Sequence, residues 1–344
     1  METKIFNWGV EETMETKIFK REQLDEAVSL LREGELVAFP TETVYGLGAL
    51  ATRDDSVKKV YAAKGRPSDN PLIVTVADEA MMRPYAKEVP ERAEKLIKHF
   101  WPGPLTILLL AKEGALPESA TGGLPTVAFR CPDDQLTHDL IAKLGYPIVG
   151  PSANTSTKPS PTTAQHVYHD LKGKIAGIVD GGETEVGLES TIVDLSVNPA
   201  VVLRPGKITP EEISQVLGEE VLINRGQVSD KDVPKAPGMK YRHYAPSAQV
   251  YVVDQAETFA KLDLDVSCGV MATSDLLENL PVPEENKFNL GKNLTEADHN
   301  LFAGLRYFDD RPEIKSIYVE GFDQGEESLA YMNRLNKAAG GHHV

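Results

Sequence analysis

Residues 36–76 read LVAFPTETVYGLGALATRDDSVKKVYAAKGRPSDNPLIVTV. The apolar runs at 36–39 and 72–74 are typical of short buried strands. Between them, an acidic pair opens a helical pattern that ends at Gly65. We therefore predict a strand, a turn, a helix, a basic bend and a second strand, an order typical of an α/β domain.

The basic bend carries Lys64 and Arg66, followed by Pro67, Asn70 and Pro71. Arginine offers a planar fork of donors and lysine a point charge, and both suit a phosphate group. The alternative is a solvated helix end whose cations offset the negative end of the helix dipole. The prolines favour an anion site, because a stiff bend is needed only where its shape matters.

The chain up to residue 207 continues with helices and strands. We predict strands at 105–110, 126–130, 147–149, 175–179, 188–194 and 201–206, and helices at 22–33, 90–100, 133–144 and after Thr162 or Thr163. Either Asp133 or Asp134 is expected to cap the third of these helices. Several strands follow one another without a helix, which favours a mixed sheet over a doubly wound parallel one.

The composition changes after a predicted helix at 210–217. Prolines and a glycine interrupt residues 224–247, which predicts an inter-domain linker. Beyond it, strands at 249–253, 268–272 and 315–320 alternate with helical stretches at 257–262, 296–308 and 328–337. We therefore expect a second, smaller α/β domain of about one hundred residues.

Length and charge limit the possible functions. A chain of 344 residues with a net charge of −16 can hold two domains and disfavours non-specific binding to nucleic acid. No apolar run is long enough to cross a bilayer and no secretory signal is apparent. Two cysteines, Cys131 and Cys268, give no disulfide framework, so we expect a cytoplasmic protein. The repeat of METKIF at 1–6 and 14–19 indicates either a duplicated start site or an extra edge strand.

A second candidate site follows the strand at 147–149. Ser152 and Asn154 offer small hydrogen-bonding groups where a strand ends, a common position for ligand-binding loops. An ordinary turn is an equal alternative. No set of cysteines, histidines and carboxylates has the spacing of a zinc site, so we predict no protein-bound metal.

Several ordered motifs now resemble one family. They are Pro40–Leu47, the Lys64/Arg66 pair, Asn70–Leu72, Trp101–Thr106, Arg130, Pro151–Asn154, Glu189–Thr191 and Leu203–Gly206. This set resembles the YrdC/Sua5 family of threonylcarbamoyl-AMP synthases. The resemblance implies a YrdC-like mixed twisted sheet with helices at 21–207, preceded by an extension at 1–20. It also implies a linker over the active site at 208–247 and a Rossmann-like α/β domain at 248–344.

The resemblance implies a reaction of L-threonine, bicarbonate and ATP that gives threonylcarbamoyl-AMP and pyrophosphate. The product would pass to a threonylcarbamoyl-transferase that modifies adenosine 37 of tRNA (t6A). Mg²⁺ would be carried by the ATP phosphates. The implied catalytic residues are Lys64 and Arg66. The implied ATP contacts are Lys64, Arg66, Asn70, Thr126, Ser152, Asn154, Ser160, Arg204 and Tyr241. The implied threonine contacts are Thr43, Thr75, Arg130 and Ser190.

Each of these assignments has a plainer alternative. Arg130 could pair with a nearby acid such as Asp133, and the hydroxyl groups could be satisfied by backbone. Two other functions also remain open: a concave surface that holds RNA, and carbamoyl transfer from carbamoyl phosphate. The acidic composition and the lack of basic stripes disfavour RNA contact. The lack of cysteine-rich zinc modules disfavours the carbamoyl phosphate reaction.

Overall fold

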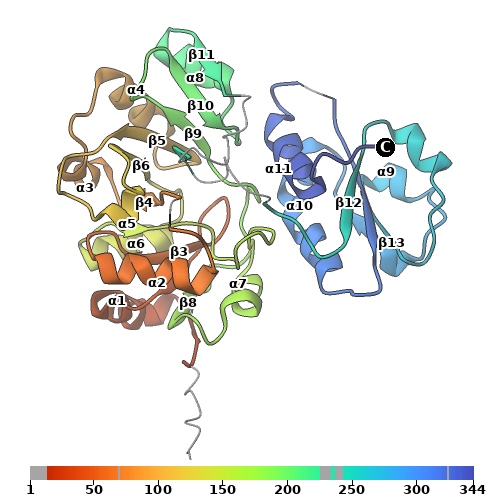
Figure 1. Ribbon diagram of the computed structural model, residues 1–344, viewed down its shortest axis with the longest axis horizontal. Coiled ribbons are helices and arrows are strands. Elements are labelled where there is room, and N and C mark those ends of the chain that lie inside the picture. Colours follow the sequence, from red (N-terminus) through yellow and green to blue (C-terminus); the bar gives the residue numbers. More distant parts are fainter. Residues whose placement is uncertain (1–13, 69, 225–233, 237–242, 324) are drawn as a thin grey trace, which may run out of the picture.

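The structure is a computed structural model that describes residues 14–68, 70–224, 234–236, 243–323 and 325–344. It consists of two α/β domains, and both contain a sheet with helices packed against it (Figure 1). The larger domain is built around eleven strands and the smaller one around four.

The larger sheet has the order β1-β8-β2-β3-β7-β4-β6-β5-β9-β10-β11. Its strands are β1 Lys17–Phe19, β2 Val37–Phe39, β3 Gly46–Leu50, β4 Ile73–Thr75, β5 Leu105–Leu110, β6 Thr126–Arg130, β7 Ile148–Val149, β8 Gly177–Val179, β9 Thr191–Asp194, β10 Ala200–Arg204 and β11 Val221–Ile223. Neighbouring strands run both ways: β5 is antiparallel to β6 and parallel to β9. The predicted mixed sheet is confirmed.

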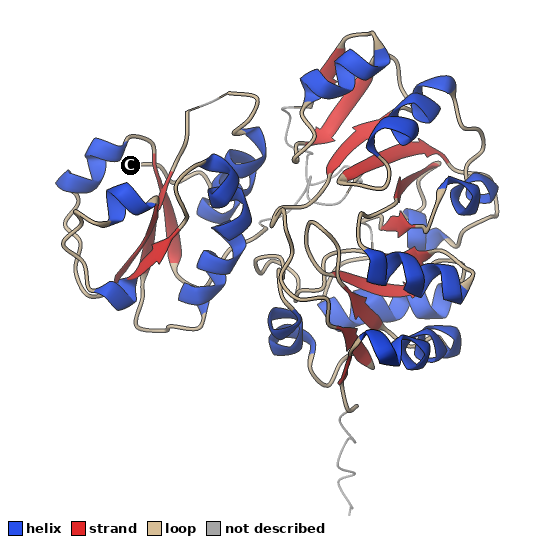
Figure 2. Ribbon diagram, turned by 180° about the vertical axis from the view of Figure 1, so that it is seen from behind, coloured by secondary structure: helices blue, strands red, loops and turns tan. Residues whose placement is uncertain are grey.

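Helices cover this sheet on both faces (Figure 2). They are α1 Leu24–Glu33, α2 Asp54–Lys64, α3 Glu79–Met82, α4 Glu91–Phe100, α5 Glu118–Thr121, α6 Gln135–Leu144, α7 Ala164–Leu171 and α8 Pro210–Leu217, with 3₁₀ turns η1 Arg21–Gln23 and η2 Arg83–Tyr85. Along β2, Val37 and Phe39 pack with α1 and α6, whereas Ala38 packs with α2 and α7. This division follows from the two-residue alternation of side chains along a strand.

The predicted helix boundaries agree with the structure within a few residues. Asp134 accepts a hydrogen bond from Thr137 N at 2.8 Å and caps α6, and Thr163 accepts one from His166 N at 3.2 Å and caps α7. In both cases the second of the two candidate residues is the cap. Gly65, in a left-handed conformation, ends α2 as predicted.

Strand β3 differs from the turn that the sequence pattern predicts. We expected a turn after Pro40, but β3 returns antiparallel to β2, with Val37 opposite Gly48. Its glycines hide the usual apolar alternation, because the neighbours leave no room for a side chain. A Cβ on Gly46 would lie 2.4 Å from the Phe39 ring, and one on Gly48 would lie 2.7 Å from the Val37 carbonyl oxygen.

Two of the expected segment boundaries differ from those of the sheet. β1 lies inside the range 1–20, yet it pairs in parallel with β8, so this part is an edge strand rather than a free extension. At the other end, α8 and β11 lie inside 208–247, yet β11 pairs in parallel with β10. The segment between the two sheets therefore begins after Ile223.

The smaller domain has a wholly parallel sheet in the order β12-β15-β13-β14. Its elements are β12 Gln249–Val253, η3 Ala256–Lys261, β13 Cys268–Ala272, α9 Ser274–Leu277, η4 Glu284–Asn286, β14 Lys287–Asn289, α10 Leu294–Asp309, β15 Ser316–Glu320 and α11 Leu329–Ala339. A parallel sheet with crossover helices matches the Rossmann-like expectation. Helices α10 and α11 lie on the side that faces the larger domain (Figure 1). Among the described residues, no helix has the length and apolar character of a membrane span.

Candidate functional site

A cavity of about 60 Å³ lies at the start of β4 and the ends of β6, β7 and β10, beneath the loop that follows β7. The predicted residues that line it are Lys64, Arg66, Arg130, Ser152, Asn154 and Arg204. Residues 156–158, Glu189, His243 and Tyr244 complete much of its wall. The four predicted cations come from the end of α2 and the bend after it (Lys64, Arg66), from β6 (Arg130) and from β10 (Arg204). Their convergence on one small space is a geometry suited to a polyanion.

Lys64 is the last residue of α2 and is buried. Its ammonium group donates to the carbonyl oxygens of Ser152 and Asn154, the latter at 2.7 Å, and to Asn154 Oδ1 at 3.3 Å. Burial lowers the pKa of Lys64 well below its usual value, and the charge of nearby Arg66 adds to this shift. A negative ligand would reverse this trend, because an opposite charge favours the protonated amine.

Arg66 follows the helix end and lies within 3.4 Å of the carbonyl oxygens of Asn70 and Pro71. The Tyr61 hydroxyl packs against the bend: it lies 2.8 Å from Ser119 O and 3.0 Å from Asn70 O, and its single hydrogen can be donated to either carbonyl oxygen. Asn70 is itself buried, and its Oδ1 has no hydrogen-bond partner among the described residues. The bend is thus well supported by protein contacts, as its prolines predict.

Glu189 is the buried anion among these cations. Its Oε1 accepts the Ser160 hydroxyl at 2.5 Å, and its Oε2 accepts Arg334 Nε at 2.9 Å. Burial opposes ionisation, but the charges of Arg334 and Arg204 lower the pKa of Glu189 to about 2. Burial also lowers the pKa of Arg204 to about 10. In this structure Ser160 therefore contacts Glu189, and it is not part of the cavity wall.

The four predicted threonine contacts lie close to the same strand ends. Thr75 and Arg130 are register partners on β4 and β6. The Ser190 hydroxyl lies 2.8 Å from Thr106 Oγ1 and accepts Arg204 at 3.2 Å. Thr43 Oγ1 lies 2.9 Å from Thr41 Oγ1. Of these contacts, only Arg130 lines the cavity itself.

Arg130 has a different partner from the one that the sequence suggested. Its guanidinium donates to Glu42 Oε2 at 2.6 Å, and both side chains are buried. Asp133 is not its partner. The Nε of Arg130 and the Oε1 of Glu42 have no hydrogen-bond partners among the described residues. Within this part of the chain, the pair therefore leaves one buried donor and one buried acceptor unsatisfied.

The structure does not show Thr126 or Tyr241, two of the predicted ATP contacts, in the cavity wall. Thr126 is buried at the start of β6 and does not line the cavity. Tyr241 lies outside the described residues. Sequence reasoning assigned no role to Glu42 or Glu189, although both stand inside motifs that carried the resemblance. The available signal was their position, because each directly precedes a predicted threonine contact, Thr43 or Ser190.

A second cavity, of about 390 Å³, lies between α4 and α6. Its wall includes Asp78, Glu79, Asp133 and Asp134, so it is unsuited to a phosphate. We therefore place the candidate site in the smaller, cationic cavity. Among the described residues, no group of three or more histidines, cysteines or carboxylates could hold a metal ion.

Comparison with known proteins gives the same two-part division. The YrdC-type family profile described as "Telomere recombination" matches residues 29–206, and a profile described as "Threonylcarbamoyl-AMP synthase, C-terminal domain" matches 208–340. The chain is 46% identical to the threonylcarbamoyl-AMP synthase of Pyrococcus abyssi, over 93% of this chain and 96% of that protein. It is 45% identical to the enzyme of the same name from Bacillus subtilis, over 99% of both chains.

A solved structure agrees in fold over almost the whole length. The crystal structure of P. abyssi Sua5 complexed with L-threonine superimposes with a TM-score of 0.88 and 44% identity. It covers 96% of this chain and 99% of that one. The arrangement of both domains is therefore shared with that protein.

Proposed function

Because the chain belongs to the Sua5 family of threonylcarbamoyl-AMP synthases, we propose that it joins L-threonine, bicarbonate and ATP. It is an enzyme of the nucleotidyltransferase type. The amine of threonine and bicarbonate form a carbamate with loss of water. A carbamate oxygen then attacks the α-phosphorus of ATP, the bond to the β-phosphate oxygen breaks, and pyrophosphate leaves. The observation that carries this proposal is the convergence of Lys64, Arg66, Arg130 and Arg204 on one cavity.

Such a transfer depends on positioning and charge neutralisation rather than on a covalent nucleophile. Lys64 and Arg66 would hold the triphosphate and stabilise charge on the departing pyrophosphate. The lysine amine already faces two carbonyl oxygens, so it would exchange part of this contact for phosphate oxygens. Asn70, Thr126, Ser152, Asn154, Ser160, Arg204 and Tyr241 are proposed to surround the nucleotide.

Threonine would bind beside the Arg130–Glu42 pair. The free Nε of Arg130 suits the substrate carboxylate, and Thr43, Thr75 and Ser190 offer hydroxyl groups near the same strand ends. In this position the amino acid would lie between the Arg130–Glu42 pair and the phosphate-binding bend. This position would bring the carbamate that forms on the threonine amine toward the α-phosphate, as in-line attack by a carbamate oxygen requires.

Mg²⁺ is proposed to accompany ATP as part of the substrate. The described residues offer no cage of protein ligands for it, so phosphate oxygens and water would supply most of its ligands. Its charge would add to that of the lysine and arginines in neutralising the triphosphate.

The segment between the domains is proposed to act as a lid. His243 and Tyr244 line the cavity, and Ala245 N donates to Thr157 O at 2.9 Å. Ligand pockets typically measure about 300–1,000 Å³, so the present cavity must open to admit ATP. Excluding water would protect the mixed anhydride product from hydrolysis.

We propose that the product serves tRNA modification at adenosine 37, through a separate threonylcarbamoyl-transferase in the cytoplasm. The two cysteines are free and buried, which suits a reducing compartment. Neither RNA contact nor carbamoyl transfer from carbamoyl phosphate gains support, because the relatives that match over nearly the whole chain are named synthases.

The phosphate assignment predicts the effect of two substitutions. Lys64→Ala and Arg66→Ala should each reduce pyrophosphate release by at least about a hundredfold, because a charge-stabilising donor is removed. The assay is pyrophosphate release that depends on both threonine and bicarbonate. Lys59→Ala on the same helix is the control, since its ammonium pairs with Glu35 at the surface at 2.7 Å.

Circular dichroism and the unfolding midpoint would confirm that the variants are folded. If either variant kept near-normal turnover, the phosphate assignment would be wrong. If the wild-type protein released pyrophosphate without threonine, the proposed reaction itself would be wrong.

A further inference from the structure

The loop between β7 and α7 forms one wall of the cavity and has an unusual backbone. Residues 156–158 line the cavity, and Thr157 has a φ of 75°. Among the described residues, Thr157 and Tyr244 are the non-glycine residues with positive φ, and both line this cavity. A side chain in the left-handed region is strained and persists only where its surroundings hold it. Other contacts must therefore hold the loop.

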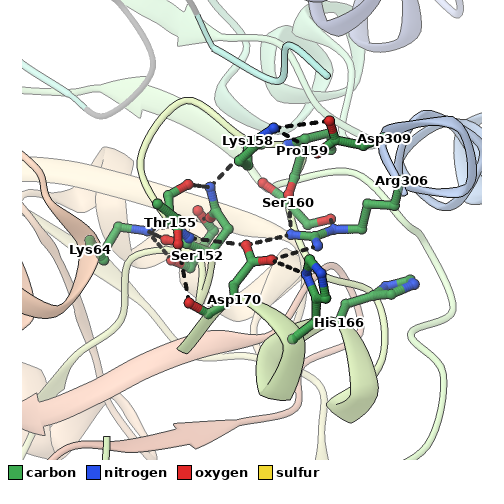
Figure 3. Close-up of polar contacts among 12 residues, drawn as sticks. Lys64, Ser152, Thr155, Lys158, Pro159, Ser160, His166, Asp170, Arg306 and Asp309 are labelled. Atoms are coloured by element: carbon green, nitrogen blue, oxygen red, sulfur yellow. Dashed lines mark hydrogen bonds and ion pairs between the residues drawn. The ribbon is translucent and has the colours of Figure 1, made fainter. Parts of the chain in front are cut away.

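These contacts come from the smaller domain. Arg306 on α10 donates to the Pro159 carbonyl oxygen at 2.5 Å and approaches that of Ser160 at 3.4 Å (Figure 3). Asp309, one turn further along the same helix, accepts Lys158 Nζ at 2.8 Å. One helix of the smaller domain thus binds three consecutive residues of the loop.

Arg306 also reaches the start of the loop through Asp170 on α7. Its two terminal nitrogens bind the two carboxylate oxygens of Asp170, at 3.0 and 2.9 Å. Asp170 Oδ2 in turn accepts the backbone N–H of Thr155 at 3.0 Å. Both side chains of the pair are buried, with 8% and 5% of their surfaces exposed. Burial would raise the pKa of Asp170, but the hydrogen bonds and charge of Arg306 hold it below its usual value.

The chain of contacts ends at the phosphate-binding lysine. Asn154 Nδ2 donates to the carbonyl oxygens of Thr155 and Lys158, each at 2.9 Å, so it spans the loop. The carbonyl oxygen of Asn154 accepts Lys64 Nζ, and Ser156 N donates to Lys64 O at 2.8 Å. The position of the loop therefore sets where the Lys64 ammonium lies (Figure 3).

We propose that Arg306 is a positioning residue of the nucleotide site, and that the smaller domain completes this site from outside by clamping the loop at 155–161. Arg306 does not touch the cavity. It acts through Asp170 and the loop carbonyls, which place Ser152, Asn154 and Lys64 for the triphosphate. This inference rests on the proposed function, because it assumes that ATP binds at Lys64.

The test uses the full-length protein with Arg306→Gln and Arg306→Lys. Loss of the bidentate contact between Arg306 and Asp170 should raise the KM for ATP by about tenfold or more. The reason is that small displacements of binding groups have large kinetic effects. The affinity for threonine, measured by calorimetry without ATP, should stay within about twofold, because Arg130 lies on β6 and Glu42 in the turn between β2 and β3, outside the loop that Arg306 holds. Binding of a non-hydrolysable ATP analogue gives the same readout without turnover.

Arg311→Gln is the matched control. Arg311 follows the same helix, but its guanidinium binds Glu313 at 2.9 Å and Asn286 at 3.1 Å, both within the smaller domain. The Arg311→Gln variant should leave the affinities for ATP and for threonine unchanged. A double-mutant cycle with Asp170→Asn should be non-additive if Arg306 acts through Asp170.

Two results would overturn the inference: an ATP affinity of Arg306→Gln within twofold of wild type, or an equal loss for both substrates that follows the unfolding midpoint. If Arg306→Gln fails to fold, Arg306→Lys decides, because it keeps the charge and loses the fork. Failure of the wild-type protein to release pyrophosphate with threonine and bicarbonate would instead refute the proposed function.

Discussion

Buried charged pairs are the individual features that most distinguish this site. Arg130–Glu42, Arg334–Glu189 and Arg306–Asp170 are each nearly inaccessible to solvent. Such pairs add little net stability, because desolvation offsets their attraction, yet breaking one leaves a buried charge without a partner. We infer that these pairs serve to fix positions, because each holds a charged side chain or a loop at the edge of the cavity.

Glu42→Gln tests this view. We expect it to lower the free energy of unfolding by about 3 kcal/mol, because Arg130 would keep its buried charge without a counterion. Urea unfolding of the purified variant gives the value. Glu35→Gln, which removes the surface partner of Lys59, should cost under about 1 kcal/mol. Equal costs for the two variants would contradict a special role for burial.

Among the elements, β3 shows how glycine permits a strand that its sequence conceals. β3 pairs with β2 on one side and β7 on the other, and Phe39 lies over it. Glycines at 46 and 48 allow this close approach and remove the side chains that a periodic pattern would reveal. The motif PTETVYGLG therefore turns the chain at the cavity, where Val44 forms part of the wall, and returns it along β3.

Gly48→Ala should destabilise the protein by about 1–3 kcal/mol, since the added methyl group would overlap the Val37 carbonyl oxygen and displace a strand. The measurement is the unfolding midpoint by circular dichroism. Gly325→Ala is the control, because nothing lies within 4 Å of its Cβ position. A Gly48→Ala variant as stable as the control would show that the sheet can move apart there without cost.

In the whole molecule, the two domains meet through charged side chains and through an apolar cluster that includes Val44 and Leu188, not through a continuous sheet. Arg334 on α11 donates to Pro205 O at 2.7 Å and to Glu189 O at 3.1 Å, while α10 supplies Arg306 and Asp309. The larger sheet, however, extends past residue 207 to β11. The sheet of the larger domain therefore continues past Gly206, where the last motif ends.

Two truncations should show whether the larger domain folds when it ends at residue 207 or only when it ends at residue 224. Deleting 208–344 removes α8 and β11, exposing the core under Ile213 and Leu217 and leaving the β10 edge unpaired, so we expect aggregation. Deleting 225–344 keeps both elements and should give a soluble, folded domain. Size-exclusion chromatography and thermal unfolding distinguish them. Equal behaviour of the two fragments would show that α8 and β11 are dispensable.

Local sequence patterns predicted much of the secondary structure of this protein. Apolar periodicity and capping residues predicted most helices and several strands of both domains, because these signals act between neighbours in the chain. The motifs also identified the cations that converge on the cavity. The pattern failed at β3 and at short edge strands, where glycine or brevity removes the periodic signal.

The amino-acid order thus specified the family, the mixed sheet and the cationic bend after α2. The partners of the buried charges came from folding alone: Arg130 meets Glu42 rather than Asp133, and Arg306 reaches Asp170 from another domain, 136 residues away in sequence. Local spacing cannot give such pairs, because which strands become neighbours and which helix faces them depend on the packing of the whole chain.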